Sequence, residues 1–556
     1  MDNFLLLKLN RSIWVSLLEE GRVLDAISYF ETYRNNLMML KNDKTFQHQV
    51  QDELMMSLGL FLGKMNKLAK EYMKETNYSD ALICYTSIFK YDQYDVYNLR
   101  DYIQCLNELQ QFDLAKELIY HLEQIVPADS EVYKLLSEIY SRNNEIQKAV
   151  ENYEKYLELK GSSKITASEY NQLGCYYNIL YSDLTAQYSD VKKSLECFEK
   201  AVQMEPFNRL FYKNATIMAS KANDKTKTRI FWDKLIELDE LTNDDKYDYA
   251  AFCIKTENYE DWYKYFDARF LKENNKTAYP KISQPKWNGV KDISNSVLLV
   301  HYEQGYGDTF LMWGYMPRLV KLAKHVIFVV QDSVYELLKE NDFGVEVIPR
   351  SLFNQNKVKF DYHIPSMSIP IALRLKRENI SAGGGYIKPD DKLVAEYKEK
   401  YFNNEKFKIG ISFSGSAAGN QTRNIPLKDL LVLDKLKNVE IYSLTKDVED
   451  EQFKIFTNNK IHNIAADFNN FNQTAAAIAN LDVVITTDNC ILNLAGALGK
   501  RTFALFNWHY EFRWFDLSGD NVVWLTSVKP FVNDKMNNWS YSVSRAVDEI
   551  KKIMNS

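Results

Sequence analysis

The chain has 556 residues and a net charge of -6, and its 46% hydrophobic and 26% charged content is ordinary for a soluble globular protein. The length predicts several domains, and the weak negative charge gives no reason to expect nucleic acid or an anionic membrane as a partner. The six cysteines form no CxxC pair and no run of roughly 18 apolar residues occurs, so we expect a cytoplasmic protein without a membrane span.

A small residue recurs with a fixed spacing in the first half of the chain. Ala81, Ala115 and Ala149 are 34 residues apart, and a large residue follows each of them one helical turn later. A helix that packs against its neighbour needs a small residue at the tightest crossing and a large one a turn later. The period and the pattern resemble the tetratricopeptide repeat (TPR); the alternative is a generic α-solenoid whose spacing is accidental.

The sequence predicts five to seven such units in a domain over residues 1–275. The unit after Ala149 is longer, because the matching residue, Ser194, comes 45 positions later, and an insertion near residues 181–188 explains the difference. TPR-like arrays present a groove that binds peptides or other domains. We therefore expect an acceptor protein or glycan as a partner of this domain, and a homo-oligomer is left open.

The second half of the chain changes from helical repeats to alternating strands and helices. Pro280 and Pro285 mark a linker over residues 276–292. The alternation beyond it predicts parallel sheets covered by helices on both faces, an α/β fold after the α part. We expect two Rossmann-like lobes at 293–388 and 405–540, a linker at 389–404, and a final helix at 541–556 that packs across both lobes. The strand candidates are Val297–Val300, Val326–Val330, Val345–Ile348, Lys408–Phe413, Val439–Leu444, Val483–Thr486, Thr502–Phe506 and Val522–Leu525.

A set of motifs in this half carries a family resemblance. They are VLLVHYEQGYGD at 297–308, KIGISFSGS at 408–416, TRNIPLKDL at 422–430, DFNNFNQTAAAIANLDVVITTDNCILNLAGALGKRTFALF at 467–506 and EFRWF at 511–515. In this order they are similar to bacterial TPR-containing glycosyltransferases related to the ADP-heptose:lipopolysaccharide heptosyltransferases, the glycosyltransferase family 9-like group. The resemblance implies the GT-B architecture, in which two Rossmann-like lobes face a common cleft, here after a TPR-like α-solenoid.

Asp308 is the candidate catalytic residue, because it enters a helix directly after a glycine loop. Inverting glycosyl transfer needs a base that takes the proton from the acceptor hydroxyl, and the matching acid of the heptosyltransferases is the proposed base. The alternative is that Asp308 caps the helix. Gly305 and Gly307 are expected to let the backbone approach a ligand and adopt positive φ; the alternative is a tight turn without a ligand.

Three polar residues of the same loop are expected on the acceptor and sugar side of the cleft. They are His301, Glu303 and Gln304. For His301 the alternative is a hydrogen-bonded residue at a strand end, with no ligand.

The second lobe supplies the donor side. Small hydroxyl residues and free amides follow its first strand, where they can hold a diphosphate, at Ser412, Ser414, Gly415 and Ser416. The resemblance places Arg423 at the donor phosphates, where an arginine neutralises the departing nucleoside diphosphate without a metal. The alternative for Arg423 is a solvated loop charge.

A strand that ends near Ile485 leads into a helix whose first amides are aimed at phosphate, at Thr487, Asp488 and Asn489. The alternative for Asp488 and Asn489 is an N-cap alone. The relatives usually have Thr and His where this chain has Asn489 and Asn493; Asn493 can hydrogen-bond a sugar but carries no charge, so the resemblance does not fix the donor sugar. Thr474 lies at a helix entry that approaches the nucleotide in the relatives, and capping explains it equally well.

These features together predict a metal-independent inverting hexosyl- or heptosyltransferase with no cofactor and a nucleotide diphosphate sugar as donor. The TPR array would recruit the acceptor, such as a flagellin, an adhesin or another surface protein. One alternative is an enzyme of the same fold that acts on lipopolysaccharide or capsule glycan, and another is a non-catalytic TPR scaffold with a degenerate transferase body. No HExxH and no GxxxxGK[ST] motif occurs, so neither a zinc site nor an NTPase is expected.

Overall fold

The computed structural model describes residues 3–41, 47–182, 188–272, 282–415, 421–446, 448, 450–459 and 461–556. The chain forms two compact units: residues 1–180 with 196–206, and residues 181–195 with 207–556. The first unit is helical, and the second joins further helices to two parallel sheets.

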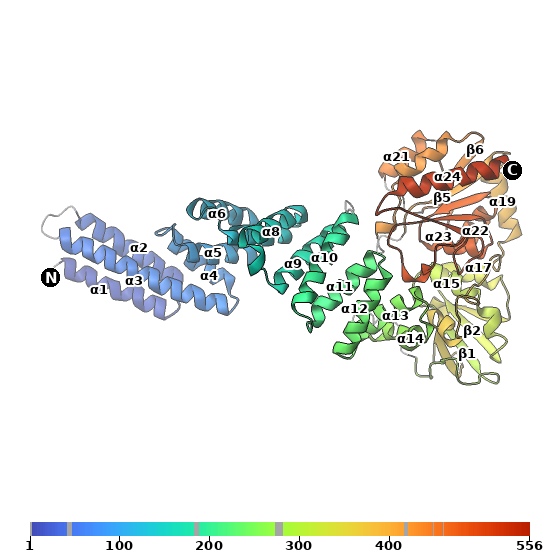
Figure 1. Ribbon diagram of the computed structural model, residues 1–556, viewed down its shortest axis with the longest axis horizontal. Coiled ribbons are helices and arrows are strands. Elements are labelled where there is room, and N and C mark those ends of the chain that lie inside the picture. The colour runs from blue at the N-terminus through green and yellow to red at the C-terminus, as the bar shows by residue number, and fades with distance from the viewer. Residues whose placement is uncertain are drawn as a thin grey trace. The chain divides into compact units, whose positions relative to one another are not determined.

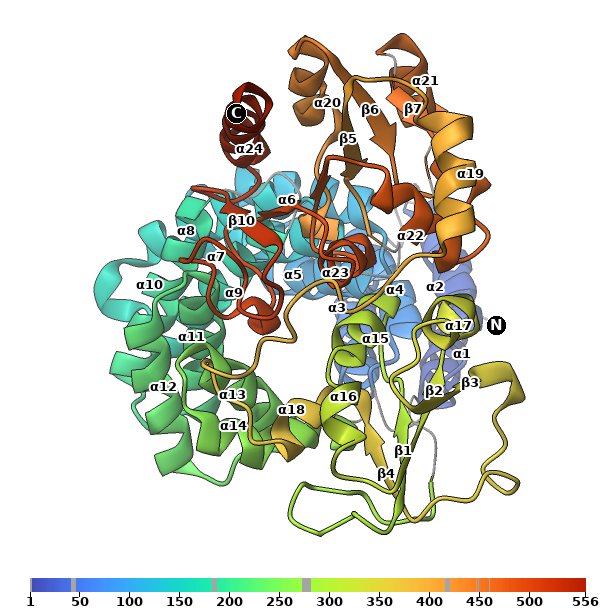
Figure 2. The ribbon, with the colours of Figure 1, turned by 90° about the vertical axis from the view of Figure 1, so that its right-hand side faces the viewer.

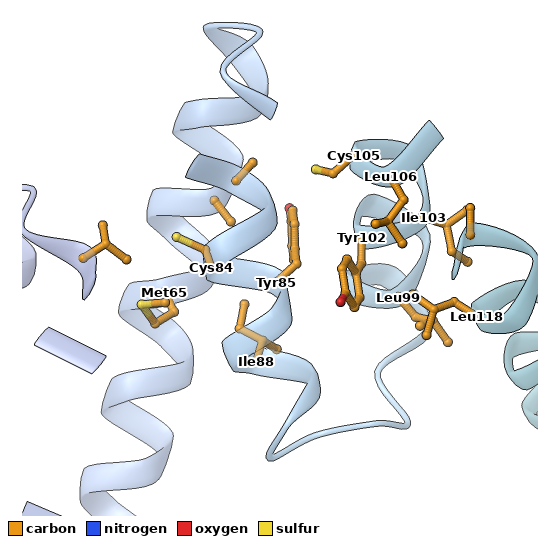
Figure 3. Close-up of a cluster of buried hydrophobic side chains, with 14 of the residues drawn as sticks. Met65, Cys84, Tyr85, Ile88, Leu99, Tyr102, Ile103, Cys105, Leu106 and Leu118 are labelled. Carbon is orange, nitrogen blue, oxygen red and sulfur yellow. The ribbon is translucent and has the colours of Figure 1, made fainter. Parts of the chain in front are cut away.

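The helices between residues 3 and 160 of the first unit each pack against the next along the chain (Figure 1). The helices up to residue 204 are α1 (Asn3–Glu19), α2 (Val23–Leu40), α3 (Gln47–Lys74), α4 (Tyr78–Phe89), α5 (Val96–Glu108), α6 (Phe112–Ile125), α7 (Ser130–Arg142), α8 (Ile146–Lys160), α9 (Ala167–Ser182) and α10 (Tyr188–Met204), with the short 3-10 turn η1 (Ser162–Lys164). Tyr85 of α4 and Tyr102 of α5 contribute to the core between these two helices, whereas Cys84 is turned toward Met65 of α3 (Figure 3).

The predicted helical array and its 34-residue period are confirmed by burial. Ala81, Ala115 and Ala149 are all fully buried. The turn inside each helix pair repeats as well: the residue five positions before each of these alanines has left-handed φ, at Thr76 (58°), Gln110 (60°) and Asn144 (60°). The predicted insertion at 181–188 lies largely outside the described residues, which resume at 188.

The helix pairs continue into the second unit. Asn223 and Glu257 repeat the left-handed turn, with φ of 56° and 58°, again 34 residues apart. These helices are α11 (Arg209–Lys221), α12 (Lys225–Leu238), α13 (Asn243–Lys255) and α14 (Tyr259–Tyr265), followed by the 3-10 turn η2 (Phe266–Leu271). The change of element type lies near residue 271, but the last helix pairs are compact with the sheets rather than with the first unit.

The first lobe is built on a four-stranded parallel sheet in the order β3-β2-β1-β4. Its strands are apolar and buried in β1 and β2, as expected for a sheet covered on both faces. The elements are β1 (Val297–His301), α15 (Tyr306–Trp313), α16 (Met316–Leu319), β2 (His325–Val330), α17 (Asp332–Lys339), β3 (Val345–Pro349), η4 (Arg350–Leu352), β4 (Tyr362–Pro365), η5 (Ser366–Ser368) and α18 (Ile369–Ala372).

The second lobe has a six-stranded parallel sheet in the order β10-β9-β8-β5-β6-β7, so the strand order reverses between β5 and β8. Loops that leave two strands at such a reversal diverge and leave a crevice at their carboxyl ends. The elements are α19 (Asp391–Tyr401), β5 (Phe407–Ser412), η6 (Gln421–Arg423), α20 (Leu427–Leu430), η7 (Leu431–Lys435), β6 (Val439–Ser443), α21 (Asp450–Asn458), β7 (Ile461–Asn463), η8 (Ala465–Asp467), α22 (Phe471–Ala479), β8 (Val483–Thr486), α23 (Cys490–Ala497), β9 (Thr502–Phe506), η9 (Phe512–Trp514), β10 (Val528–Val532) and α24 (Trp539–Asn555).

Three expectations about this half need correction. The strand candidate at Val522–Leu525 is wrong, and the edge strand is β10. Lys529 and Pro530 obscure β10 in the sequence, because they interrupt its apolar pattern. A proline is tolerated there, since β10 lies at the edge of the sheet. The predicted linker at 389–404 is mostly α19, which packs on α22. The buried face of α24 belongs to the core of the second lobe, on β9 and β10, rather than across both lobes.

The two lobes touch through α15 of the first, which packs against α23 of the second, and through α17, which packs against α22 (Figure 2). None of the described helices combines the length and the apolar character that crossing a bilayer requires.

Candidate functional site

A cavity of about 580 Å³ lies between the two lobes. The carboxyl ends of β1, β5 and β8 all open towards it, because each of these strands leads into a loop that lines it. Its volume falls in the range of roughly 300–1,000 Å³ that is typical of small-molecule sites. Among the predicted residues, the lining includes Gln304, Gly305, Gly307, Asp308, Ser412, Ser414, Gly415, Arg423, Thr474, Asp488, Asn489 and Asn493.

Asp308 lies in the first turn of α15, as predicted, and its side chain is only 6% exposed. Its Oδ1 forms an ion pair with Nη1 of Arg513, which comes from η9 of the second lobe. The N-cap of α15 is Gly305 and no side chain caps the helix, so the structure gives Asp308 an interaction across the cavity rather than a capping bond.

The two glycines of the loop differ from the prediction, since neither has positive φ. Gly305 has φ of -72°, and a Cβ placed there would meet nothing within 4 Å. At Gly307 a Cβ would lie 2.6 Å from Nδ2 of Asn493 and 3.3 Å from Cα of Cys490. The absence of a side chain at Gly307 therefore serves the close packing of α15 on α23, and Gly305 has no such constraint.

Two of the three polar loop residues turn away from the cavity. The Glu303 side chain is fully buried, and its carboxylate accepts hydrogen bonds from Arg269 and from the Met367 amide, at 2.7 Å. These contacts compensate the charge of the carboxylate inside the protein. His301 is also buried, with its ring stacked on His363 at 5.5 Å, and burial lowers the pKa of His301 to about 3. Gln304 alone of the three lines the cavity.

On the second lobe, Asn489 connects the loops at the strand reversal. Its Oδ1 accepts the first amides of α23, those of Ile491 at 2.9 Å and Leu492 at 3.3 Å, so the N-cap reading is confirmed for Asn489. Its Nδ2 donates to Ser412 Oγ at 2.8 Å and to the Ser414 carbonyl at 3.0 Å. Asn489 thus fixes the loop after β5 against the start of α23.

Arg423 faces the cavity from η6, beside this pair of loops. Its guanidinium lies directly over Gly415, where a Cβ would come within 2.9 Å of Nη2. Among the described residues Arg423 has no carboxylate within ion-pair distance, and its buried Nε has no hydrogen-bond partner. A charged donor group without a partner, next to backbone amides, suits an anionic ligand.

Asp488 and Asn493 also line the cavity on the side of the second lobe. Burial raises the pKa of Asp488, and the neighbouring Arg513 and Arg423 oppose that rise. Asn493 is 3% exposed; its Nδ2 donates to the Asn489 carbonyl at 3.3 Å, and its Oδ1 is buried without a partner among the described residues.

The remaining predicted donor residues are placed as follows. Thr474 lines the cavity from α22. Thr487 does not line it: its hydroxyl donates to the Arg423 carbonyl and so holds the arginine loop. Ser416 lies outside the described residues.

Several residues of the cavity were not predicted. Arg513 is the most important, and its only signal in the sequence was its place in the EFRWF motif. Phe471 closes the cavity between the lobes, since its ring meets Tyr306 at 4.9 Å and Phe310 at 5.0 Å. The other unpredicted lining residues are Tyr306, Ser333, Leu444, Thr445, Lys446, Phe468, Asn469, Asn470, Cys490 and Ile491. Within the described ranges, no three His, Cys, Asp or Glu side chains are gathered so that they would hold a metal ion.

No family model matches the chain, and no curated protein matches it. Solved structures resemble parts of it: MamA is 16% identical over 32% of this chain and 92% of its own, with a TM-score of 0.28. YrrB, described as a TPR protein with an unusual peptide-binding site, is 13% identical over 34% of this chain and 93% of its own, with a TM-score of 0.29. PilF of Pseudomonas aeruginosa is 10% identical over 38% of this chain and 91% of its own, with a TM-score of 0.31. The assignment of the cavity therefore rests on its own geometry.

Proposed function

We propose that the protein is an inverting glycosyltransferase of GT-B type, which moves a sugar from a nucleoside diphosphate to a hydroxyl of an acceptor. The observation that carries the proposal is a cavity lined by a carboxylate of the first lobe, Asp308, and by two arginines of the second, Arg423 and Arg513, of which Arg513 pairs with Asp308. A base on one side and cations on the other match the two charges that such a transfer develops.

In the proposed reaction Asp308 takes the proton of the acceptor hydroxyl while the acceptor oxygen forms its bond to the anomeric carbon. The bond from that carbon to the diphosphate oxygen breaks, and the electron pair leaves with the nucleoside diphosphate. Arg423 would hold the departing charge without a metal ion, since Arg423 lines the cavity and has no carboxylate partner in the described chain.

The helical array is proposed to bring the acceptor, a protein. In the described part of the chain the helices α1 to α14 precede the sheets, and arrays of this kind bind peptides or domains along extended surfaces. A glycan acceptor is the second candidate for the same chemistry. A non-catalytic scaffold is the third, and it is favoured by Asn489, whose side-chain groups are already engaged by the protein.

The test of catalysis uses a panel of nucleotide diphosphate sugars with the full-length protein. Donor hydrolysis or transfer is expected with at least one sugar, and Asp308→Ala is expected to lower the rate by about a hundredfold or more, the scale of a lost general base. Equal rates in both proteins would reject Asp308 as the base. If no nucleoside diphosphate binds even at millimolar concentration, the scaffold is favoured over the enzyme.

The test of recruitment removes whole helix pairs of the first unit. Deleting residues 1–92 removes α1 to α4 and leaves α11 to η2, which the second unit needs. Donor hydrolysis should persist and transfer to the native acceptor should fall. Undiminished transfer would show that these pairs do not recruit the acceptor. Mass spectrometry of the product then separates a protein acceptor from a glycan.

A further inference from the structure

Arg513 occupies a position that conflicts with a free base. Its backbone is fixed, because the Trp524 indole donates to its carbonyl and the neighbouring Phe512 packs on Tyr247 and Phe266, with ring centroids 6.1 Å and 5.8 Å away. Its guanidinium reaches across the cavity to Asp308. The Asp308 oxygen that accepts from this arginine is not available to accept from an acceptor hydroxyl at the same position.

The same guanidinium has N–H groups beyond the one that binds Asp308. An arginine has five N–H groups, of which Nη1 binds Asp308 here. Its Nε is buried and has no hydrogen-bond partner among the described residues. Arg423, whose Nε is likewise without a partner, and Cys490 and Ile491 at the start of α23 line the same cavity.

We propose that Arg513 is a shared counter-ion: it neutralises Asp308 in the free protein, and in the donor complex the diphosphate takes it, which leaves Asp308 free to accept the proton. This inference rests on the proposed function, since it names how the donor prepares the base. Arg513 would thus bind the donor directly and would act on the acceptor only through Asp308. Acceptor activation would then follow donor binding.

Competition for one cation has a consequence that a merely structural pair lacks. If Asp308 and the diphosphate compete for Arg513, removing the charge of Asp308 strengthens the binding of a nucleoside diphosphate. Removing Asp308 also removes a direct repulsion of the anion, so the single variant does not suffice. The two effects separate in a double-mutant cycle, because only the competition requires Arg513.

The experiment is calorimetry with UDP, GDP and ADP on the full chain. Asp308→Asn should tighten binding by about tenfold and Arg513→Gln should weaken it by about tenfold, the scale of close charge pairs at interfaces. In the Arg513→Gln background, Asp308→Asn should change the dissociation constant by less than about twofold. Arg513→Lys keeps a cation and should restore part of the tightening. Asp361→Asn, an exposed acid whose side chain accepts from the Val297 amide at the far end of β1, is the matched control and should leave the constant unchanged.

The outcomes distinguish the shared counter-ion from the donor site itself. If Asp308→Asn binds as wild type does, or tightens binding equally in both backgrounds, the shared counter-ion is rejected while the donor site stands. If no nucleoside diphosphate binds to the wild type, the proposed function fails together with this inference. Equal melting temperatures of the variants exclude a loss of folding as the cause.

Discussion

Arg269 and Glu303 form a fully buried ion pair between the end of the helical segment and the loop that leads to Asp308. Nε of Arg269 lies 2.9 Å from Oε2 of Glu303, and Nη2 of Arg269 lies 3.0 Å from Oε1 of Glu303. The side chain of Arg269 is 1% exposed and that of Glu303 is 0% exposed. Arg269 belongs to η2 and Glu303 follows β1 by two residues. The end of the helical segment therefore packs directly against the loop that carries Asp308 into the cavity.

Arg269→Met should destabilise the second unit by about 3–5 kcal/mol, because it leaves the Glu303 carboxylate buried without its cation. The measurement is urea unfolding followed by tryptophan fluorescence. The matched control is Arg142→Met, whose partner Glu108 is 25% exposed and which is itself 46% exposed; there the loss should stay below about 1 kcal/mol. Equal losses in the two variants would contradict the assigned role of the buried pair.

The buried pair shows why the sequence misplaced Glu303. The sequence locates the loop at the end of a strand correctly, because the apolar run of β1 and the turn residues after it are local signals. It does not show which loop side chains turn inward, since that depends on Arg269, 34 positions earlier in the chain and in another element. Glu303 and Gln304 are adjacent, and only the second reaches the cavity.

Gly307→Ala should weaken the contact between the lobes, whereas Gly305→Ala should be neutral. A Cβ at position 307 would lie 2.6 Å from the Asn493 side-chain amide and 3.3 Å from the backbone of Cys490, so the Asn493 side chain must move and the Cys490 backbone must yield slightly. At position 305 there is open space and φ is an ordinary -72°. Thermal unfolding should show a loss of about 1–3 kcal/mol for the first variant, as for other overpacked sites. If both variants melt like the wild type, the close packing at position 307 is not a constraint.

Gly415→Ala should weaken the binding of UDP, GDP or ADP by about tenfold, because the new methyl group would displace the Arg423 guanidinium that now lies over the glycine. Gly519→Ala is the control: it lies in the same lobe, and its Cβ would meet only the Asn521 carbonyl, at 3.6 Å. Calorimetry measures both. Unchanged affinity in Gly415→Ala would mean that Arg423 does not bind the diphosphate from this position.

The cavity residues of the second lobe are predicted better than those of the first, and the reason is topological. Loops that follow parallel strands at a reversal of strand order meet at one edge, so the residues after β5 and β8 converge whatever their side chains are. Arg513 follows no strand directly and reaches the cavity from a 3-10 turn held by Tyr247 and Phe266. Nothing local in the sequence gives that placement.

The acid limb of stability should depend on His301. Burial lowers its pKa from 6.5 to about 3, so between these values the unfolded chain binds a proton that the folded protein does not. Stability therefore falls as the pH drops from about 6.5 to 3, with a slope of up to ~1.4 kcal/mol per pH unit for this one group. His301→Phe removes the group and should make the decline shallower in urea unfolding between pH 7 and 4. A variant as sensitive to acid as the wild type would contradict the assignment.

Gln110→Gly should stabilise the helical array, because Gln110 is held at φ of 60° in the turn between α5 and α6. The left-handed conformation costs a residue with a Cβ about 1–2 kcal/mol, and glycine escapes that cost while losing part of the gain to its greater freedom in the unfolded chain. We expect a net gain of about 0.5–1 kcal/mol. The matched control, Gln104→Gly, changes the same residue type at an exposed position inside α5 and should lose a similar amount. Urea unfolding followed by far-ultraviolet circular dichroism should move the two midpoints in opposite directions. If both midpoints shifted to lower urea, the turn would not be strained. The left-handed residues that recur every 34 positions, at Thr76, Gln110 and Asn144, would then follow from chain geometry without an energetic cost.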